Sequence, residues 1–151
     1  MAQYVSHSHS YGESALHLQL TPKYRRSTFR DKTVLSACKH IFGHIAAQIG
    51  VQLVAAEFGP DHAHIFVRDW KRYSVPELAQ HFKGRSSYEL RKRIPEWLPR
   101  GRSFWSGGYF HETVGSVTAA ARQHYIERCQ KKHWIRQAAL NKFIKGPPPA
   151  L

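Results

Sequence analysis

Cysteine and long apolar runs are both scarce in this chain of 151 residues. Cys38 and Cys129 are the only cysteines, and each lies in a predicted helix, so we expect reduced thiols rather than a disulfide framework. No run of about 18 apolar residues is present, so a membrane-spanning helix is not expected. Residues 1–10 lack the basic and then apolar pattern of a signal peptide. These absences favour a cytoplasmic protein.

Acidic residues are also few, because 10 Asp and Glu stand against 23 Lys and Arg, for a net charge of +13. This excess favours a polyanionic partner, most commonly nucleic acid, over a basic surface with no such partner. Aromatic rings lie among the basic clusters, which suits an unstacked single strand whose bases stack on exposed rings. Rings of the core would give the same pattern. The rings in question are Tyr24, Phe29, Tyr73, Phe82, Tyr88, Trp97, Trp105 and Trp134.

Hydrophobic periodicity predicts the element order β-α-β-β-α-β-α. Strands are predicted over 15–20 (half-buried), 51–58, 61–67 and 109–114. Helices are predicted to begin at Asp31, with an end at Gly50, and at Ser74, where Glu77 completes a capping box. A last helix is predicted over 117–134, capped by Ser116. The first six elements match an α+β, ferredoxin-like (RRM-like) fold, a four-stranded antiparallel sheet with two helices on one face. We expect a flexible segment over 1–14, a single domain over 15–137 and a C-terminal tail over 138–151.

Two histidines one residue apart, His62 and His64, lie within a predicted strand. Because side chains alternate along a strand, both imidazoles point to one face, while Ala63, Ile65 and Val67 point to the other. This arrangement is half of a metal site on a sheet, and hard ions such as Mg²⁺ or Mn²⁺ would need further oxygen ligands. Alone, such a pair is also compatible with packing or with a surface position.

Tyr125 lies in the last predicted helix, among polar and basic residues. A phenol with a pKa of about 10 can attack a phosphodiester and form a covalent phosphotyrosine. A metal held by His62 and His64 would polarise the scissile phosphate. The alternative is that Tyr125 packs on the sheet with Ile126 and Cys129.

Five short motifs, in order, resemble those of the single-tyrosine HUH transposases of the IS-two-hundred / IS-six-hundred-five insertion-sequence group. The resemblance covers residues 15–137, and five motifs at sensible spacing are far more specific than any one of them. The motifs are Pro22-Lys23-Tyr24-Arg25-Arg26, Asp61-His62-Ala63-His64, Lys83-Gly84-Arg85-Ser86-Ser87, Phe104-Trp105 with Thr113-Val114-Gly115, and Tyr125-Ile126-Glu127.

The resemblance implies a DNA transposase that cleaves and rejoins single-stranded DNA at hairpin-forming element ends through a 5′-phosphotyrosine. It implies Tyr125 as the nucleophile on a C-terminal helix, His62 and His64 as ligands of Mg²⁺ or Mn²⁺, and a homodimer in the nucleoid when bound to DNA. The basic residues expected to contact DNA are Lys23, Arg25, Arg26, Lys83, Arg85 and Arg91.

The third metal ligand is where the chain departs from the resemblance. The family usually has a Gln four residues after the tyrosine, one helical turn on, but this chain has Cys129 there and Gln130 next to it. Either Gln130 reaches the metal through a shifted helix or Cys129 takes the ligand position, and a thiolate prefers softer metals such as Zn²⁺.

Two other functions stay open. The chain could be a non-catalytic, inactive or domesticated module that binds single-stranded nucleic acid, in which the histidines are structural and Cys129 marks a weakened site. It could also be a hydrolytic metal nuclease or a replication-initiation relative with the same histidine motif, although such proteins normally carry a longer chain or a second domain.

Overall fold

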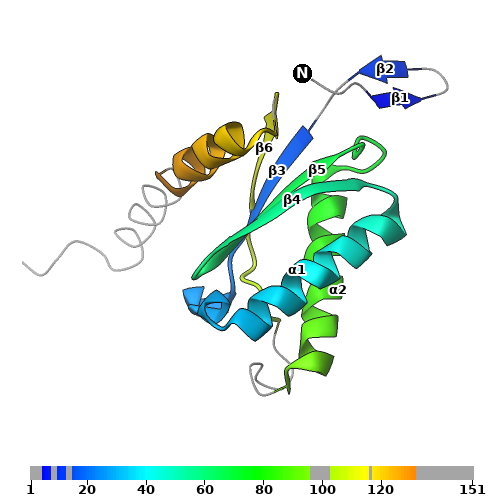
Figure 1. The fold of residues 1–151 in the computed structure, drawn as a ribbon. Coiled ribbons are helices and arrows are strands. Elements are labelled where there is room, and N and C mark those ends of the chain that lie inside the picture. Colours follow the sequence, from blue (N-terminus) through cyan, green and yellow to red (C-terminus); the bar gives the residue numbers. More distant parts are fainter. Residues whose placement is uncertain (1–4, 8–9, 13–14, 96–102, 116, 132–151) are drawn as a thin grey trace, which may run out of the picture. The chain divides into compact units, whose positions relative to one another are not determined.

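The computed structural model describes residues 5–7, 10–12, 15–95, 103–115 and 117–131 (Figure 1). The chain divides into two compact units, Met1–Val117 and Thr118–Leu151. This boundary falls inside the range 15–137 that the sequence assigns to one domain. The elements of the first unit are β1 (Val5–His7), β2 (Ser10–Gly12), β3 (Ala15–Leu20), η1 (Lys23–Arg25), η2 (Thr28–Arg30), α1 (Lys32–Ile49), β4 (Gln52–Gly59), β5 (His62–Arg68), α2 (Val75–Arg93) and β6 (Phe110–Val114).

A four-stranded antiparallel sheet with the strand order β4-β5-β3-β6 forms the centre of the first unit. β3 pairs with β5, where Leu18 lies opposite Ile65, and with β6, where His17 lies opposite Glu112. β4 and β5 form a hairpin closed at Gly59 and His62. This strand order, with helices after β3 and β5, confirms the predicted α+β, ferredoxin-like class.

Capping residues begin both long helices and end the first one, as the sequence predicts. The Asp31 carboxylate accepts hydrogen bonds from the backbone N–H groups of Thr33 and Val34, which begins α1. Gly50, with φ 76°, ends α1 in the left-handed conformation that glycine adopts without strain. At α2, Ser74 and Glu77 form the predicted capping box.

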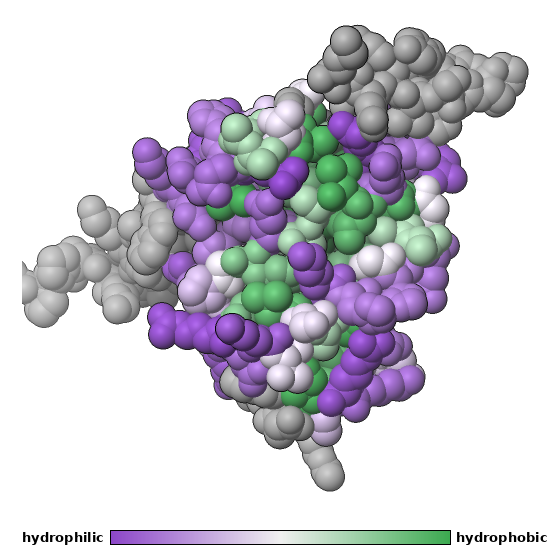
Figure 2. Space-filling view, in the orientation of Figure 1, coloured by the Kyte–Doolittle hydropathy of each residue, from purple (hydrophilic) through white to green (hydrophobic). Residues whose placement is uncertain are grey.

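The hydrophobic core lies between the sheet and the helices α1 and α2, which cover one face of it (Figure 1). Leu16, Leu18 and Leu20 of β3 point into this core, where Phe42 of α1 and Phe82 of α2 are fully buried. Figure 2 shows, in the same view, hydrophilic side chains in purple over much of the surface, with hydrophobic patches in green between them. Because α1 and α2 cover one face of the sheet, the other face is the one left for polar side chains.

One expectation about the strands is wrong in detail. All six residues of β3 are buried, so the strand is not half-buried as its alternating pattern predicted. It is central in the sheet, and its polar residues His17 and Gln19 are buried on the second face. Within residues 1–14, which are expected to be flexible, β1 and β2 form an antiparallel pair, which needs only backbone hydrogen bonds and no apolar pattern.

The second unit contains a helix over residues 119–131. It begins at Thr118, whose hydroxyl accepts a hydrogen bond from the backbone N–H of Ala121 at 3.3 Å. The expected cap, Ser116, and the expected end at 132–134 lie outside the described residues.

Among the helices of the described segments, none combines the length and the apolar character that crossing a bilayer requires.

A buried hydrogen bond connects α2 to the segment before β6. The Trp105 indole N–H donates to the Ser86 hydroxyl at 2.7 Å, and both side chains are buried.

Ser86→Ala would leave this N–H without an acceptor, so the free energy of unfolding should fall by about 1–3 kcal/mol, measured by urea denaturation. Ser36→Ala, on the exposed side of α1, is the matched control. Equal midpoints for the two variants would contradict the role of Ser86.

Candidate functional site

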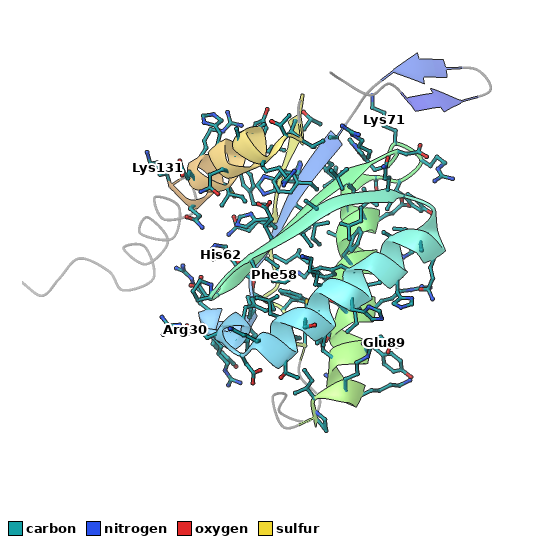
Figure 3. All side chains as sticks on the ribbon, in the orientation of Figure 1. Arg30, Phe58, His62, Lys71, Glu89 and Lys131 are labelled. Atoms are coloured by element: carbon teal, nitrogen blue, oxygen red, sulfur yellow. The ribbon has the colours of Figure 1, made fainter. Side chains whose placement is uncertain are left out.

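β5 places His62 and His64 on one face of the sheet, as the sequence predicts, and this face is the one opposite the helices. Ala63, Ile65 and Val67 belong to the core on the helical side. The ring centroids of the two histidines lie 5.0 Å apart, with the planes at 82°. His64 is buried, whereas His62 lies at the turn end of the β4–β5 hairpin (Figure 3) and is partly exposed.

The His62 ring is held by the residue before it. Its Nδ1 lies 2.6 Å from Oδ1 of Asp61, and Oδ2 of Asp61 accepts a hydrogen bond from the Arg25 guanidinium at 3.2 Å. Burial alone would raise the pKa of Asp61, but the hydrogen bonds and electrostatic attraction of His62 and Arg25 outweigh it and hold that pKa below its usual value. Arg25 reaches Asp61 from η1, where its φ of 51° is unusual for a residue other than glycine.

The His64 ring is held by two residues that the sequence analysis missed. Its Nδ1 lies 2.8 Å from Nε2 of His17, and Nδ1 of His17 lies 3.3 Å from Oε1 of Glu112. His17 is fully buried and stacks on Phe66, with the ring centroids 4.5 Å apart and the planes at 3°. The available signal was a histidine in a strand whose alternate residues are all leucine, which places the histidine on the second face.

The donor atoms of this face fit a divalent metal ion. Among the described residues, Nε2 of His64 is buried without a hydrogen-bond partner. Burial, aided by the neighbouring His17 and His62, lowers the pKa of His64 to about 2, so its imidazole is neutral, as a ligand must be. Gly59 lies opposite His62, and a Cβ at that position would collide with Nε2 of His62. The absence of a side chain at Gly59 therefore lets the His62 ring pack against the backbone there.

The pair nevertheless makes an incomplete site. Within the described segments, no group of three or more His, Cys, Asp and Glu is placed to hold a metal ion. Two imidazoles leave the remaining positions of a divalent ion to water, to a substrate oxygen or to a ligand from elsewhere.

In the second unit, Tyr125 is half-buried on the helix over 119–131, and the Arg128 guanidinium lies 5.4 Å from the centre of its ring. Because the helix is continuous through these residues, Cys129 lies about 40° around the axis from Tyr125 and Gln130 about 140°. Cys129 occupies the position one turn after the tyrosine and is fully buried, whereas Gln130 lies on another side of the helix. A ligand role for either residue stays a prediction.

The predicted DNA contacts at η1 lie beside the histidine pair, because Arg25 bonds to Asp61. Tyr24, with φ 63°, is 61% exposed, and the cationic groups of Lys23 and Arg26 lie 5.9 and 5.4 Å from the centre of its ring. The segment 23–26, called the η1 loop below, thus presents an exposed ring with positive charge next to the candidate site.

The other predicted contacts, Lys83, Arg85 and Arg91, lie on α2, in the layer on the far side of the sheet from the histidines. The Lys83 ammonium donates to the carbonyl oxygens of Ser106 and Gly108 at 2.7 and 3.3 Å, and partial burial lowers its pKa. Arg85 donates to Gln48 of α1, and Arg91 is exposed.

The aromatic rings divide between surface and core. Tyr24 and Tyr88 are exposed, whereas Phe29, Phe82 and Trp105 are buried. Trp97 and Trp134 lie outside the described residues.

Known proteins are similar to this chain in sequence over most of its length. A family described as "Transposase IS200 like" matches residues 10–129. The transposase for insertion sequence element IS200 of Salmonella typhimurium (strain LT2) is 28% identical over 99% of this chain and 95% of its own length. The ISDra2 transposase TnpA of Deinococcus radiodurans is 30% identical over 74% of this chain and 80% of its own length.

Solved structures share the fold. A crystal structure described as that of a transposase from Deinococcus radiodurans R1 matches with a TM-score of 0.67 and 29% identity, over 83% of this chain and 97% of the other. A REP-associated tyrosine transposase bound to a REP hairpin matches with a TM-score of 0.51 and 13% identity, over 80% of this chain and 67% of the other, which is a likeness of fold alone.

The His62 ring occupies the volume that a side chain at residue 59 would take. In Gly59→Ala the new Cβ would displace the His62 ring, so the affinity for Mn²⁺, measured by isothermal titration calorimetry, should fall about tenfold or more. Gly43→Ala is the matched control, because a Cβ there meets nothing within 4 Å. Unchanged affinity in Gly59→Ala would show that His62 does not bind the ion through Nε2.

Proposed function

Because the chain belongs to the IS200-like transposase family, we propose that it cleaves and rejoins single-stranded DNA at insertion-sequence ends through a 5′-phosphotyrosine on Tyr125. The observation that carries this proposal is the pair of imidazoles on one sheet face, each held at Nδ1, with Nε2 of His64 left without a partner among the described residues. The proposal requires that the Tyr125 helix meets this face, in the same chain or in a homodimer.

His62 and His64 would hold one divalent ion, Mg²⁺ or Mn²⁺, through their Nε2 atoms. The ion would supply Lewis-acid polarisation of the scissile phosphate. The chain's own residues keep both rings fixed before DNA binds, since Asp61 engages Nδ1 of His62 and His17 engages Nδ1 of His64. Such preorganisation lowers the cost of reaching the reactive geometry.

Tyr125 would act as the nucleophile. Its Oη forms a bond to phosphorus, the bond from phosphorus to the 3′-oxygen breaks, the phenol gives up its proton and the leaving 3′-oxygen takes one. A second 3′-hydroxyl reverses these changes and releases the tyrosine, so the strands are rejoined without an external energy source. Positive charge from Arg128, beside the Tyr125 ring, favours the approach of a phosphodiester.

The η1 loop would bind the single strand close to the reacting phosphate. Tyr24 offers an exposed ring for base stacking, and Lys23 and Arg26 offer charges for the backbone. The structurally similar REP-associated transposase is bound to a hairpin, which supports a hairpin-forming DNA end as the substrate.

A non-catalytic module that binds single-stranded DNA is the second candidate. Cys129 favours it, because a buried thiol stands one turn after Tyr125, and a thiol is a poor ligand for hard ions such as Mg²⁺. The two candidates differ in whether a covalent adduct forms.

Tyr125→Phe removes the nucleophile and keeps the ring. With a 3′-labelled hairpin oligonucleotide that has a single-stranded flank and with Mn²⁺, the unmodified protein should form a labelled adduct that survives denaturation, because a 5′-phosphotyrosine keeps the fragment with the 3′ end. In Tyr125→Phe the yield of the adduct should fall by at least about 10³-fold, because no other group carries the covalent step. The affinity of this variant for the DNA should change less than threefold. EDTA should abolish the adduct formed by the unmodified protein.

The control is Tyr88→Phe, because this tyrosine also lies on a helix, is exposed, and belongs to α2. It should keep the adduct. An adduct in Tyr125→Phe would refute the assignment of the nucleophile, and DNA binding by the unmodified protein without any adduct would favour the binding module.

Tyr24→Ala should weaken binding of the same oligonucleotide by about 1–3 kcal/mol through lost stacking, measured by fluorescence anisotropy. Arg26→Ala should reduce the slope of log K against log salt by about 1, through one lost phosphate contact. Lys39→Ala, an exposed cation on α1, is the control. A larger loss in Lys39→Ala than in Tyr24→Ala would place the DNA on another surface.

A further inference from the structure

Three buried or nearly buried side chains form a hydrogen-bonded chain across three neighbouring strands. Glu112 of β6 contacts Nδ1 of His17 in β3 at 3.3 Å, and Nε2 of His17 contacts Nδ1 of His64 in β5 at 2.8 Å. The side chains of His17 and Glu112 are 0% and 12% exposed. In the reaction described above His64 is a predicted metal ligand and His17 holds its ring, but Glu112 has no role.

The direction of the proton donors follows from the chemistry of the first member. The Glu112 carboxylate can only accept, so Nδ1 of His17 carries the proton. A neutral His17 then has a lone pair on Nε2, so Nδ1 of His64 must be the donor of the 2.8 Å bond. Nε2 of His64 is left with a lone pair, and this is the nitrogen without a partner among the described residues.

The opposite arrangement would disable His64 as a ligand. If His17 lost the carboxylate and carried its proton on Nε2, it would donate to His64, and His64 would hold its own proton on Nε2. A protonated Nε2 cannot bind a metal ion. The identity of residue 112 therefore decides, through His17, which nitrogen of His64 can be a ligand.

Packing prevents the His17 ring from escaping this role by rotation. Its face lies parallel to Phe66 at a centroid distance of 4.5 Å, and the edge of Phe110 approaches it at 6.2 Å. His17 also lies directly opposite Glu112 in the β3–β6 register, so the contact depends on the pairing of the sheet.

We propose that Glu112 and His17 are positioning residues, which fix the Nδ1–H tautomer of His64 and thereby keep its Nε2 available for the metal ion. This inference rests on the proposed function, in which His64 is a metal ligand. Asp61 serves His62 in the same way but directly, through one hydrogen bond rather than through a second imidazole.

Glu112→Leu tests the relay, because it removes the acceptor from an edge strand where a leucine can be accommodated. Long-range ¹H–¹⁵N spectra of the metal-free protein should show His64 protonated at Nδ1 in the unmodified chain and mainly at Nε2 in Glu112→Leu. The affinity for Mn²⁺ should fall about 10–100-fold. Glu112→Gln keeps an acceptor oxygen and should restore most of the affinity and the original tautomer.

His111→Gln is the matched control, because it lies on the same strand with its exposed side chain on the other face. It should leave both readouts unchanged. An unaltered His64 tautomer in a folded Glu112→Leu protein would overturn the inference, whatever happens to the affinity. Failure of the unmodified protein to bind Mn²⁺ would instead overturn the proposed metal centre, while the spectra would still decide the tautomer.

Discussion

Burial of polar side chains on the second face of the sheet is the constraint on which the rest of the site depends. His17, Gln19 and His64 are almost completely buried there, and a buried imidazole nitrogen without a partner destabilises the protein. Nδ1 of His62 has Asp61 as its hydrogen-bond partner, and Nδ1 of His64 has His17. Nε2 of His64 is left without a partner among the described residues, and a metal ion would remove the cost of burying it.

The helical layer and the polar face depend on each other through the alternation of β3 and β5. Leu16, Leu18 and Leu20 are held by the core beneath α1 and α2, so the register of β3 cannot slip by one residue without exposing them. The same register sets His17 opposite Glu112. The apolar core thereby fixes the positions of the polar chain that holds His64, and local propensity alone would not achieve this.

Features that depend on neighbours in sequence could be predicted from the sequence. The caps at Asp31 and Gly50, the Ser74–Glu77 capping box and the shared face of His62 and His64 follow from short-range chemistry and from strand periodicity. The partners of His64 could not be predicted, because His17 and Glu112 are 47 and 48 residues away along the chain and meet it only through the strand order β5-β3-β6. The cap at Thr118 was missed because Ser116 and Thr118 are equally suitable residue types, and only the path of the backbone distinguishes them.

Anomalous diffraction from crystals grown with Mn²⁺ tests the central claim, that the sheet presents two Nε2 atoms to a single ion, most directly. One anomalous peak should lie within bonding distance of Nε2 of both His62 and His64, with Nδ1 of each ring still bonded to Asp61 or His17. A peak at an Nδ1 atom, or ions bound only at sites away from this pair, would contradict it.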